Sequence, residues 1–334
     1  MKDNIHLIVT SISEPNDVLK SLAMGSFDNN ISFSVVGDSK SPPSFVLENC
    51  RFYSLAEQKS LSLKLAEVLP ERHYARKNIG YLEAIRNGAT ILLETDDDNY
   101  PTPDFWQPRK KIIDVPLIEN ESWVNVYHYF SDGFIWPRGY PMEYLKKVPP
   151  EFDNLERKKV FCPIQQGLAD ENPDVDAVYR LTYPLPFSFN KNHSVALGKG
   201  SWCPFNSQNT TWFKEVFPLL YLPTYCSFRM TDIWRSFVAQ RILWENNLHV
   251  LFHGSTVWQE RNEHNLLDDF KDEIPGYLNN DKIKKELEDM DLKKGFAYLG
   301  QNLRKCYQTL IALELVDKKE LVLIDAWNRD FEKM

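Results

Sequence analysis

The stretch Leu93-Glu94-Thr95-Asp96-Asp97-Asp98-Asn99-Tyr100 decides the fold of this chain, because an apolar run ends there in three consecutive aspartates. Residues 89–93, Ala-Thr-Ile-Leu-Leu, indicate a buried strand. Adjacent carboxylates at a strand end repel one another. A hard divalent cation, Mg²⁺ or Mn²⁺, offsets that repulsion and shares its oxygen ligands with substrate phosphates. The sequence therefore predicts a metal at Asp96 and Asp98, which share one face of an extended chain, with Asp97 on the other face.

The segment upstream of the aspartates favours this metal site over its alternative, a solvated acidic turn. Ile79, Leu82 and Ile85 recur at helical spacing, and Gly88 stands where a helix commonly ends. Three polar side chains begin this helix: Arg76, Lys77 and Asn78. Helix N-terminal amides and neighbouring cations attract anions. We therefore expect a phosphate or nucleotide to contact this turn.

The rest of the first hundred residues alternates apolar strands with amphipathic segments. Strands are expected over residues 5–12, 31–36 and 51–53, and a helix is expected over residues 60–69. This alternation predicts an α/β fold, in which a mostly parallel, doubly wound sheet presents ligand sites at the carboxyl edge of its strands.

Four ordered blocks of the chain resemble the STELLO-type glycosyltransferase family, formerly a domain of unknown function. The first block joins Arg76-Lys77-Asn78-Ile79-Gly80-Tyr81-Leu82 to residues 94–99, and the other three lie at residues 165–178, 204–210 and 228–241. The resemblance covers roughly residues 5–276. It implies a GT-A-type fold, in which a Rossmann-like mixed, mostly parallel sheet is flanked by helices. It also implies that the acidic strand end binds the metal and diphosphate of a nucleotide sugar.

The same resemblance suggests which residues contact the nucleotide sugar. Thr10 and Ser11 end the first strand, where such folds seat the base and ribose. Asp38 follows the second strand and is expected to accept hydrogen bonds from base or ribose, with an Asx turn as the alternative. Asp97 is expected to face the ribose or a neighbouring cation. Arg229 is expected at the diphosphate or at an acidic acceptor.

The acceptor side is expected further along the chain. Asp232, at the start of a helical stretch, is the candidate general base for an inverting transfer, and a helix cap paired with Arg235 is its alternative. Arg235 is itself a candidate contact of the acceptor. A sugar-binding surface is expected from amide and indole side chains, with an Asn-rich turn over core tryptophans as the alternative: Trp202, Gln208, Asn209 and Trp212.

A polar loop after the apolar residues 250–252 is expected to supply a late metal or phosphate ligand. His264 is the candidate metal ligand, in competition with His253 and Glu260, and a structural histidine is the alternative. An aromatic-rich segment that contains Arg138 is a candidate lid over the donor.

The second half has weaker periodicity than the first. Residues 106–204 are rich in Pro and aromatic residues and predict loops and short strands. Helices are expected within residues 224–246 and over residues 302–315. The predicted division is a GT-A-like domain over 1–276, made of a nucleotide-binding half (1–105) and an acceptor half (106–276), and a C-terminal helical extension over 277–334.

Composition narrows the class of protein. The net charge of −8 argues against bulk nucleic-acid binding, and 43% hydrophobic residues suffice for a sizeable core. Transmembrane helices need about 20 apolar residues, and no run here approaches that length. The first residues lack the apolar core of a signal peptide, so a cytoplasmic protein is expected, with room for peripheral membrane contact. The five scattered cysteines predict reduced thiols.

These observations support three hypotheses for function. The first is a Mn²⁺- or Mg²⁺-dependent glycosyltransferase that moves a sugar from a nucleotide-diphosphate sugar, UDP-linked, to a saccharide, glycolipid or other glycoconjugate acceptor. The second is a UDP-sugar mutase, since plant reversibly glycosylated polypeptides also carry an acidic triplet on a related fold. The third is a non-catalytic scaffold of a polysaccharide-synthesis complex.

Overall fold

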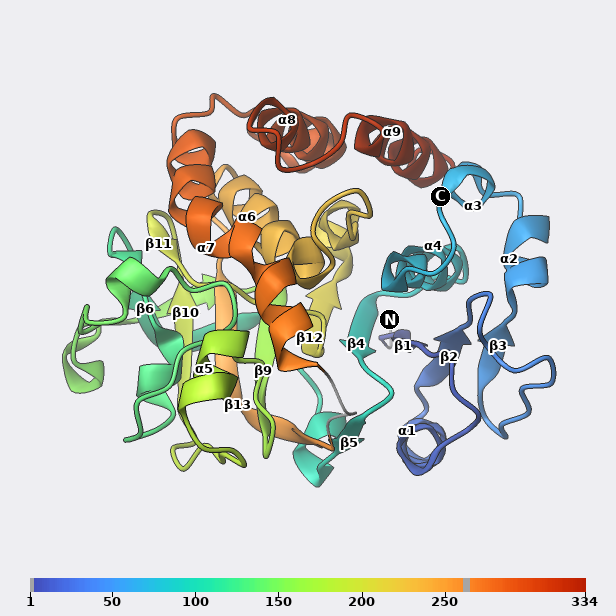
Figure 1. Ribbon diagram of the computed structural model, residues 1–334, viewed down its shortest axis with the longest axis horizontal. Helices are drawn as coiled ribbons and strands as arrows, with labels where there is room; N and C mark the ends of the chain where they lie inside the picture. Colours follow the sequence, from blue (N-terminus) through green and yellow to red (C-terminus); the bar gives the residue numbers. More distant parts are fainter. Residues whose placement is uncertain (1–2, 261–264) are drawn as a thin grey trace.

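The computed structural model describes residues 3–260 and 265–334, which form one large mixed sheet flanked by helices (Figure 1). The strand order is β3-β2-β1-β4-β12-β9-β13-β10-β6-β8, with β5 paired to β13 beside this path. The first four strands of this order are parallel, at β1 Ile5–Thr10, β2 Ser32–Val36, β3 Arg51–Tyr53 and β4 Ile91–Thr95. The strands expected in the first half of the chain are therefore confirmed.

Four helices connect these strands: α1 Asp17–Asp28, α2 Leu55–Ser60, α3 Lys64–Val68 and α4 Lys77–Arg86. Gly88 follows α4 with a φ of +81°, as expected for a glycine that ends a helix. The helix expected over residues 60–69 is present but shorter, because α3 starts only at residue 64. There the Asp330 carboxylate accepts hydrogen bonds of 2.9 Å from the amides of Lys64 and Leu65. A partner so distant in sequence leaves no local signal.

The second half of the sheet begins with a reversal of direction. β12 (Asn209–Phe213) is antiparallel to β4 and to β9 (Ile164–Asp170), so β9 and its parallel neighbour β13 (Val250–Gln259) run again in the direction of β4. The remaining elements of this half are short: β5 Asn99–Pro101, β6 Ile112–Ile118, β7 Ser122–Trp123, β8 Arg157–Phe161, α5 Ala177–Thr182, β10 Ser194–Leu197 and β11 Ser201–Trp202. The expected loops and short strands are thus confirmed.

Helices occupy the last third of the chain: α6 Thr231–Trp244, α7 Leu266–Glu288, α8 Leu299–Ala312 and α9 Glu320–Phe331. The helices expected within residues 224–246 and near residues 302–315 are confirmed as α6 and α8. α7 continues through Pro275, so the predicted domain boundary after residue 276 falls inside a helix. The domain division stays a prediction.

The C-terminal helices also contact the chain that precedes α6. The buried Glu320 carboxylate accepts hydrogen bonds from the amides of Thr224 and Tyr225. Short 3₁₀ turns complete the described structure: Tyr74–Arg76, Pro103–Trp106, Val126–Tyr129, Met142–Tyr144, Phe152–Asn154, Lys214–Leu220, Phe228–Met230 and Phe296–Tyr298. Across residues 3–260 and 265–334, none of the helices has the length and apolarity to span a membrane.

Candidate active site

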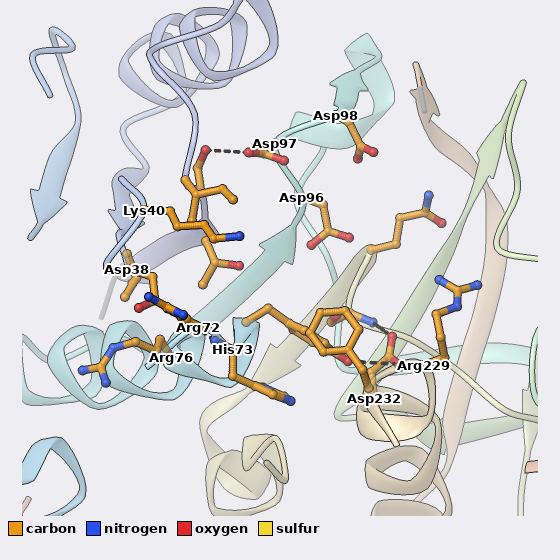
Figure 2. A pocket seen from close by; sticks show the side chains of 18 of the residues that line it. Asp38, Lys40, Arg72, His73, Arg76, Asp96, Asp97, Asp98, Arg229 and Asp232 are labelled. Atoms are coloured by element: carbon orange, nitrogen blue, oxygen red, sulfur yellow. Dashed lines mark hydrogen bonds between the residues drawn. The ribbon is translucent and has the colours of Figure 1, made fainter. Parts of the chain in front are cut away.

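A cavity of about 400 Å³ lies where β1, β2 and β4 end (Figure 2). Each of these parallel strands delivers polar residues to the same edge of the sheet, as expected for an open α/β sheet. The start of β12 and the start of α6 close the opposite wall. The lining includes ten of the candidate site residues that the sequence singled out: Thr10, Ser11, Asp38, Arg76, Asp96, Asp97, Asp98, Gln208, Arg229 and Asp232.

The three aspartates after β4 all line the cavity, and each has a different partner. Asp97 accepts a 2.5 Å hydrogen bond from the Ser11 hydroxyl and turns toward β1 in Figure 2. Asp98 accepts a 3.0 Å hydrogen bond from the Gln259 amide group. Asp96 is contacted by Lys77 at 2.9 Å through Oδ1, and its Oδ2 receives no hydrogen bond within the described part of the chain.

Burial sets the electrostatics of this acidic wall. It raises the pKa of Asp96 above the usual value, although the nearby Lys77 ammonium opposes the rise. It also raises the pKa of Asp97, against the hydrogen bond from Ser11. Desolvated carboxylates beside one another destabilise their charged forms. An added cation at this wall would therefore be favourable.

The three polar residues at the start of α4 have different positions. Lys77 is fully buried, and its ammonium bridges Asp96 and the Thr95 carbonyl at 2.9 Å each. Arg76 lines the cavity, but its guanidinium donates to the Gln58 amide oxygen at 2.6 Å and to the Leu69 carbonyl at 3.0 Å.

Asn78 is absent from the cavity lining. Its amide group exchanges hydrogen bonds of 2.8 and 2.9 Å with the backbone of Leu222. This contact fixes the segment between β12 and α6 to α4. Asp38 stays at the cavity, where its carboxylate accepts from the backbone amides of His73 at 3.0 Å and Ser39 at 2.6 Å.

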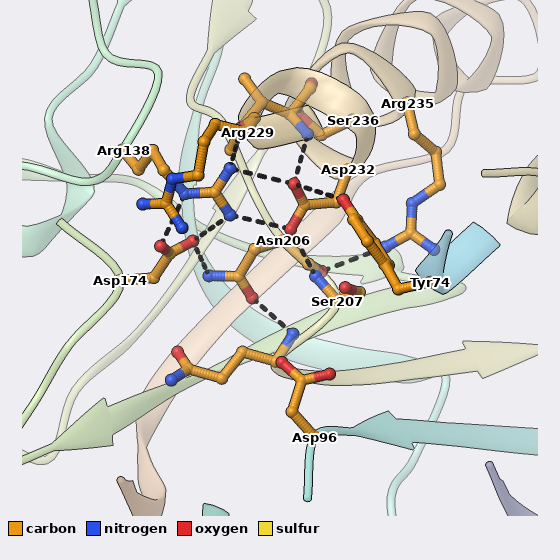
Figure 3. A network of polar contacts seen from close by, with 12 residues as sticks. Tyr74, Asp96, Arg138, Asp174, Asn206, Ser207, Arg229, Asp232, Arg235 and Ser236 are labelled. Carbon is orange, nitrogen blue, oxygen red and sulfur yellow. Dashed lines mark hydrogen bonds and ion pairs between the residues drawn. The ribbon is translucent and has the colours of Figure 1, made fainter. Parts of the chain in front are cut away.

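Asp232 lies at the first turn of α6 and is almost completely buried. Both of its oxygens accept hydrogen bonds from the Arg138 guanidinium, at 3.0 and 2.9 Å (Figure 3). The amide of Ser207 lies 3.2 Å away and the hydroxyl of Tyr74 lies 3.4 Å away. The alternative pairing with Arg235 is wrong, because Arg138 takes that place.

Arg138 also binds a second carboxylate. Its Nε and Nη2 donate to Asp174 at 2.7 and 2.9 Å, so that one guanidinium bridges two acids. Burial alone would raise the pKa of Asp232, but Arg138 outweighs it and lowers that pKa to about 2. General bases work best with a pKa near the working pH. In this arrangement Asp232 is therefore a fixed anion and a weak proton acceptor.

Arg235 is hydrogen-bonded to partners other than Asp232. Its guanidinium forms a buried ion pair with Glu94 of β4, at 3.0 and 2.7 Å, and its charge lies 5.0 Å from the Trp212 ring. Arg235 is not among the residues that line the cavity. The pair instead joins α6 to β4, the strand that carries the three aspartates. Arg229 does line the cavity, and it is held by Glu273 of α7 at 2.8 Å.

The expected sugar-binding surface is only partly at the cavity. Gln208 lines it, whereas Trp202 and Trp212 are completely buried in the hydrophobic core. Asn209 is buried and donates to the Leu168 carbonyl at 2.8 Å. Indole rings suit a core as well as a sugar, and composition cannot separate the two uses.

The metal or phosphate ligand expected from the loop after residues 250–252 stays a prediction. His264 lies outside the described residues. His253 is not in the cavity lining, and burial lowers its pKa to about 3. The backbone amide of Glu260 donates to the Asp98 carbonyl at 3.0 Å, which places the end of β13 beside the acidic wall.

Sequence reasoning missed several residues of the cavity. Asp174 and Phe228 lie within the family-like blocks, so the resemblance contained a signal for them. Arg138 stood out only as part of an aromatic-rich segment. His73 and Tyr74 precede the helical repeat and carried no signal of their own.

The fold and the cavity together define a class of protein. A parallel half that continues through a reversed strand into a mixed half, with carboxylates at the end of the fourth strand, is the arrangement of GT-A-type glycosyltransferases. The GT-A-like fold expected from the sequence is confirmed.

The amino-acid sequence is similar to that of known glycosyltransferases. The model of the STELLO glycosyltransferases matches residues 229–334. Two Arabidopsis thaliana proteins, Probable glycosyltransferase STELLO2 and STELLO1, are 31% identical over 272 residues and 30% identical over 276 residues, which is 75% of this chain in both cases. The chain is thus similar to the STELLO glycosyltransferases over three quarters of its length. It spans 35% of the length of either relative.

Among solved structures, the chain is similar to a mycobacterial protein, with a TM-score of 0.42, 12% identity and coverage of 83% of this chain and 74% of that one. It is also similar to M. tuberculosis glucosyl-3-phosphoglycerate synthase, with a TM-score of 0.41, 9% identity and coverage of 83% and 80%. At these scores the likeness adds nothing to the fold assignment, which rests on the strand order.

Proposed function

We propose that this chain is a metal-dependent glycosyltransferase that uses a nucleotide-diphosphate sugar, UDP-linked, as its donor. The observation that carries the proposal is the wall of three carboxylates at the end of β4, in a cavity that also contains the ends of β1 and β2. The Lys77 ammonium lies behind that wall, on Asp96. The three carboxylates and the diphosphate are all negatively charged, so this site binds a diphosphate only when a cation lies between them.

The residues present fit a divalent cation, Mn²⁺ or Mg²⁺. Asp96 keeps one oxygen without a protein donor in the described residues, and Asp98 stands two residues further along the chain. No group of three His, Cys, Asp or Glu side chains within residues 3–260 and 265–334 forms a ready metal site. Magnesium and manganese often complete their shell with substrate phosphates, so two carboxylates suffice here. The bound cation would offset charge on the leaving diphosphate.

We assign the opposite wall, around Asp232, to a saccharide or glycoconjugate acceptor. Asp232 and Gln208 both line the cavity across from the aspartates of β4. The Arg138 pair keeps Asp232 ionised and oriented, which suits an anion that holds an acceptor hydroxyl. A role as general base requires that Arg138 shift away from Asp232 during the reaction.

Binding of UDP with and without Mn²⁺ tests the donor assignment by calorimetry. We expect UDP to bind the wild type with Mn²⁺, and Asp98→Asn to lose at least tenfold in affinity because a metal ligand becomes neutral. Asp17→Asn is the matched control, since Asp17 is exposed on α1 and its ion pair within the described residues is with Lys20. Equal Mn²⁺-dependent UDP affinity in Asp98→Asn and the wild type would reject the metal site.

Turnover of a panel of UDP-sugars separates the functions. Mn²⁺-dependent release of UDP supports transfer, a new UDP-sugar isomer indicates a mutase, and binding with neither outcome indicates a scaffold. Asp232→Asn should bind UDP normally, and a general base is worth roughly 10²–10⁴ in rate. A loss of that size supports the base role, whereas a loss below tenfold assigns Asp232 to positioning only.

A further inference from the structure

Three rings form one side of the cavity, and we call them the aromatic wall: His73, Tyr74 and Phe228. The His73 and Tyr74 rings are stacked with centroids 5.3 Å apart, and the Phe228 ring meets them edge-on at 5.2 and 5.0 Å. Phe228 is nevertheless 48% exposed. A large apolar ring held rigidly by its neighbours, yet open to a polar cavity, offers a binding face.

His73 adds an unused hydrogen-bond donor to this wall. Its Nδ1 accepts a 3.0 Å hydrogen bond from the Ala75 amide, which places the proton of the neutral ring on Nε2. That Nε2 is buried and has no partner among the described residues. Burial lowers the pKa of His73 to about 4, so the ring is neutral near pH 7. Buried polar atoms without a partner are rare in folded proteins and call for an explanation.

The aromatic wall contacts Asp38 at one end and Asp232 at the other. The backbone amide of His73 donates to Asp38 at 3.0 Å, and the Tyr74 hydroxyl lies 3.4 Å from Asp232. Figure 2 shows His73 between Arg76 and Asp232. A ligand on the Tyr74 side of the wall would therefore lie beside Asp232.

We propose that Phe228 and His73 form the saccharide subsite of the acceptor: a pyranose ring stacks on Phe228, and the neighbouring rings shift so that His73 Nε2, buried in the ligand-free protein, donates a hydrogen bond to one of the pyranose hydroxyls. A pyranose has apolar C–H faces and a rim of hydroxyls, which matches an aromatic face beside a lone donor. The subsite replaces the surface expected from Trp202 and Trp212, whose rings are inaccessible. The assignment of this saccharide as acceptor rests on the proposed function.

Ligand-observed NMR with a panel of methyl glycosides, in the presence of UDP and Mg²⁺, tests the subsite. We expect at least one glycoside to bind the wild type and Phe228→Ala to weaken it about tenfold, because the stacking face is lost. Phe228→Trp should retain binding. His73→Asn keeps an acceptor for the Ala75 amide but removes the far nitrogen, so it should weaken binding about three- to tenfold.

Phe296→Ala is the matched control, because Phe296 is 49% exposed and does not line the cavity. UDP affinity should be the same in all these variants. No glycoside bound by a wild type that binds UDP, or equal glycoside affinity in Phe228→Ala, would overturn the subsite. If an intact UDP-sugar displaced the glycoside and UDP did not, the aromatic wall would bind the donor sugar. That result would also overturn the acceptor subsite. A wild-type protein that binds a glycoside but does not bind UDP would instead contradict the proposed function, while the saccharide site itself would be supported.

Discussion

The cavity has two groups of carboxylates, one at each end, and their negative charge is stabilised to different degrees. At the β4 end (Asp96, Asp97 and Asp98), burial raises the pKa of Asp96 and Asp97. At the α6 end (Asp174 and Asp232), Arg138 overcomes burial and lowers the pKa of Asp232 to about 2. Both ends have a buried cation, but Lys77 offers one ammonium to one oxygen of Asp96, whereas the Arg138 fork serves two carboxylates.

This contrast indicates that the β4 end, and not the α6 end, requires a ligand to balance its charge. At the α6 end the Arg138 guanidinium hydrogen-bonds both carboxylates, so Asp232 is a rigid anion before any substrate arrives. The β4 end has excess negative charge, so a cation stabilises it. A protein that stores unfavourable charge at one site commonly does so where a ligand binds.

The largest expected effect on stability comes from replacing Arg138, the cation of the α6 end. Arg138→Met removes the guanidinium that hydrogen-bonds Asp174 and the buried Asp232, and should lower the free energy of unfolding by about 3–5 kcal/mol. Urea denaturation measures it. Arg138→Lys keeps the charge but loses the fork, so its loss should be smaller. A loss below about 1 kcal/mol for Arg138→Met would show that these carboxylates reach solvent.

The matched change at the β4 end should cost less. Lys77→Met removes the cation from Asp96, whose side chain is 38% exposed, against 5% for Asp232. Because water can take over from Lys77, we expect a loss of about 2 kcal/mol in the same urea experiment. A loss equal to that of Arg138→Met would remove the contrast between the two ends.

The smallest effect should be a gain. A carboxyl whose pKa is raised in the folded state destabilises the protein at neutral pH, and that penalty disappears as the pH falls through the raised pKa. Asp97→Asn should therefore stabilise the metal-free protein by roughly 1 kcal/mol at pH 7. Thermal unfolding across the pH range measures it. The gain should vanish in acid, and a loss of stability at pH 7 would contradict the raised pKa of Asp97.

Much of the β4 end could be predicted from sequence, because its signals are local. The strand that precedes Asp96, the helix that begins at Lys77 and the glycine after it are all visible in short windows. The α6 end could not be predicted in this way. Arg138 and Asp232 are 94 residues apart, and nothing near either residue indicates the other.

The orientation of single polar side chains also depends on contacts that are distant in sequence. Asn78 was a candidate phosphate contact at a helix start, and the structure turns it to the backbone of Leu222, 144 residues away. Arg235 was a candidate acceptor contact, and the structure buries it against Glu94, 141 residues away. A polar residue type shows what a side chain is able to bind, whereas its direction depends on the element packed against it.

The alternation of strands and helices, the acidic end of β4 and the resemblance to the STELLO family could all be read in the amino-acid sequence, because spacing, capping and motif order are properties of neighbouring residues. Only the tertiary structure decided that Asp232 is clamped by Arg138, that the tryptophans belong to the core and that Phe228 stays open to the cavity. Burial and ion pairing arise where segments distant in the chain meet, and the low dielectric of that meeting point sets both the cost of each charge and the partner that stabilises it.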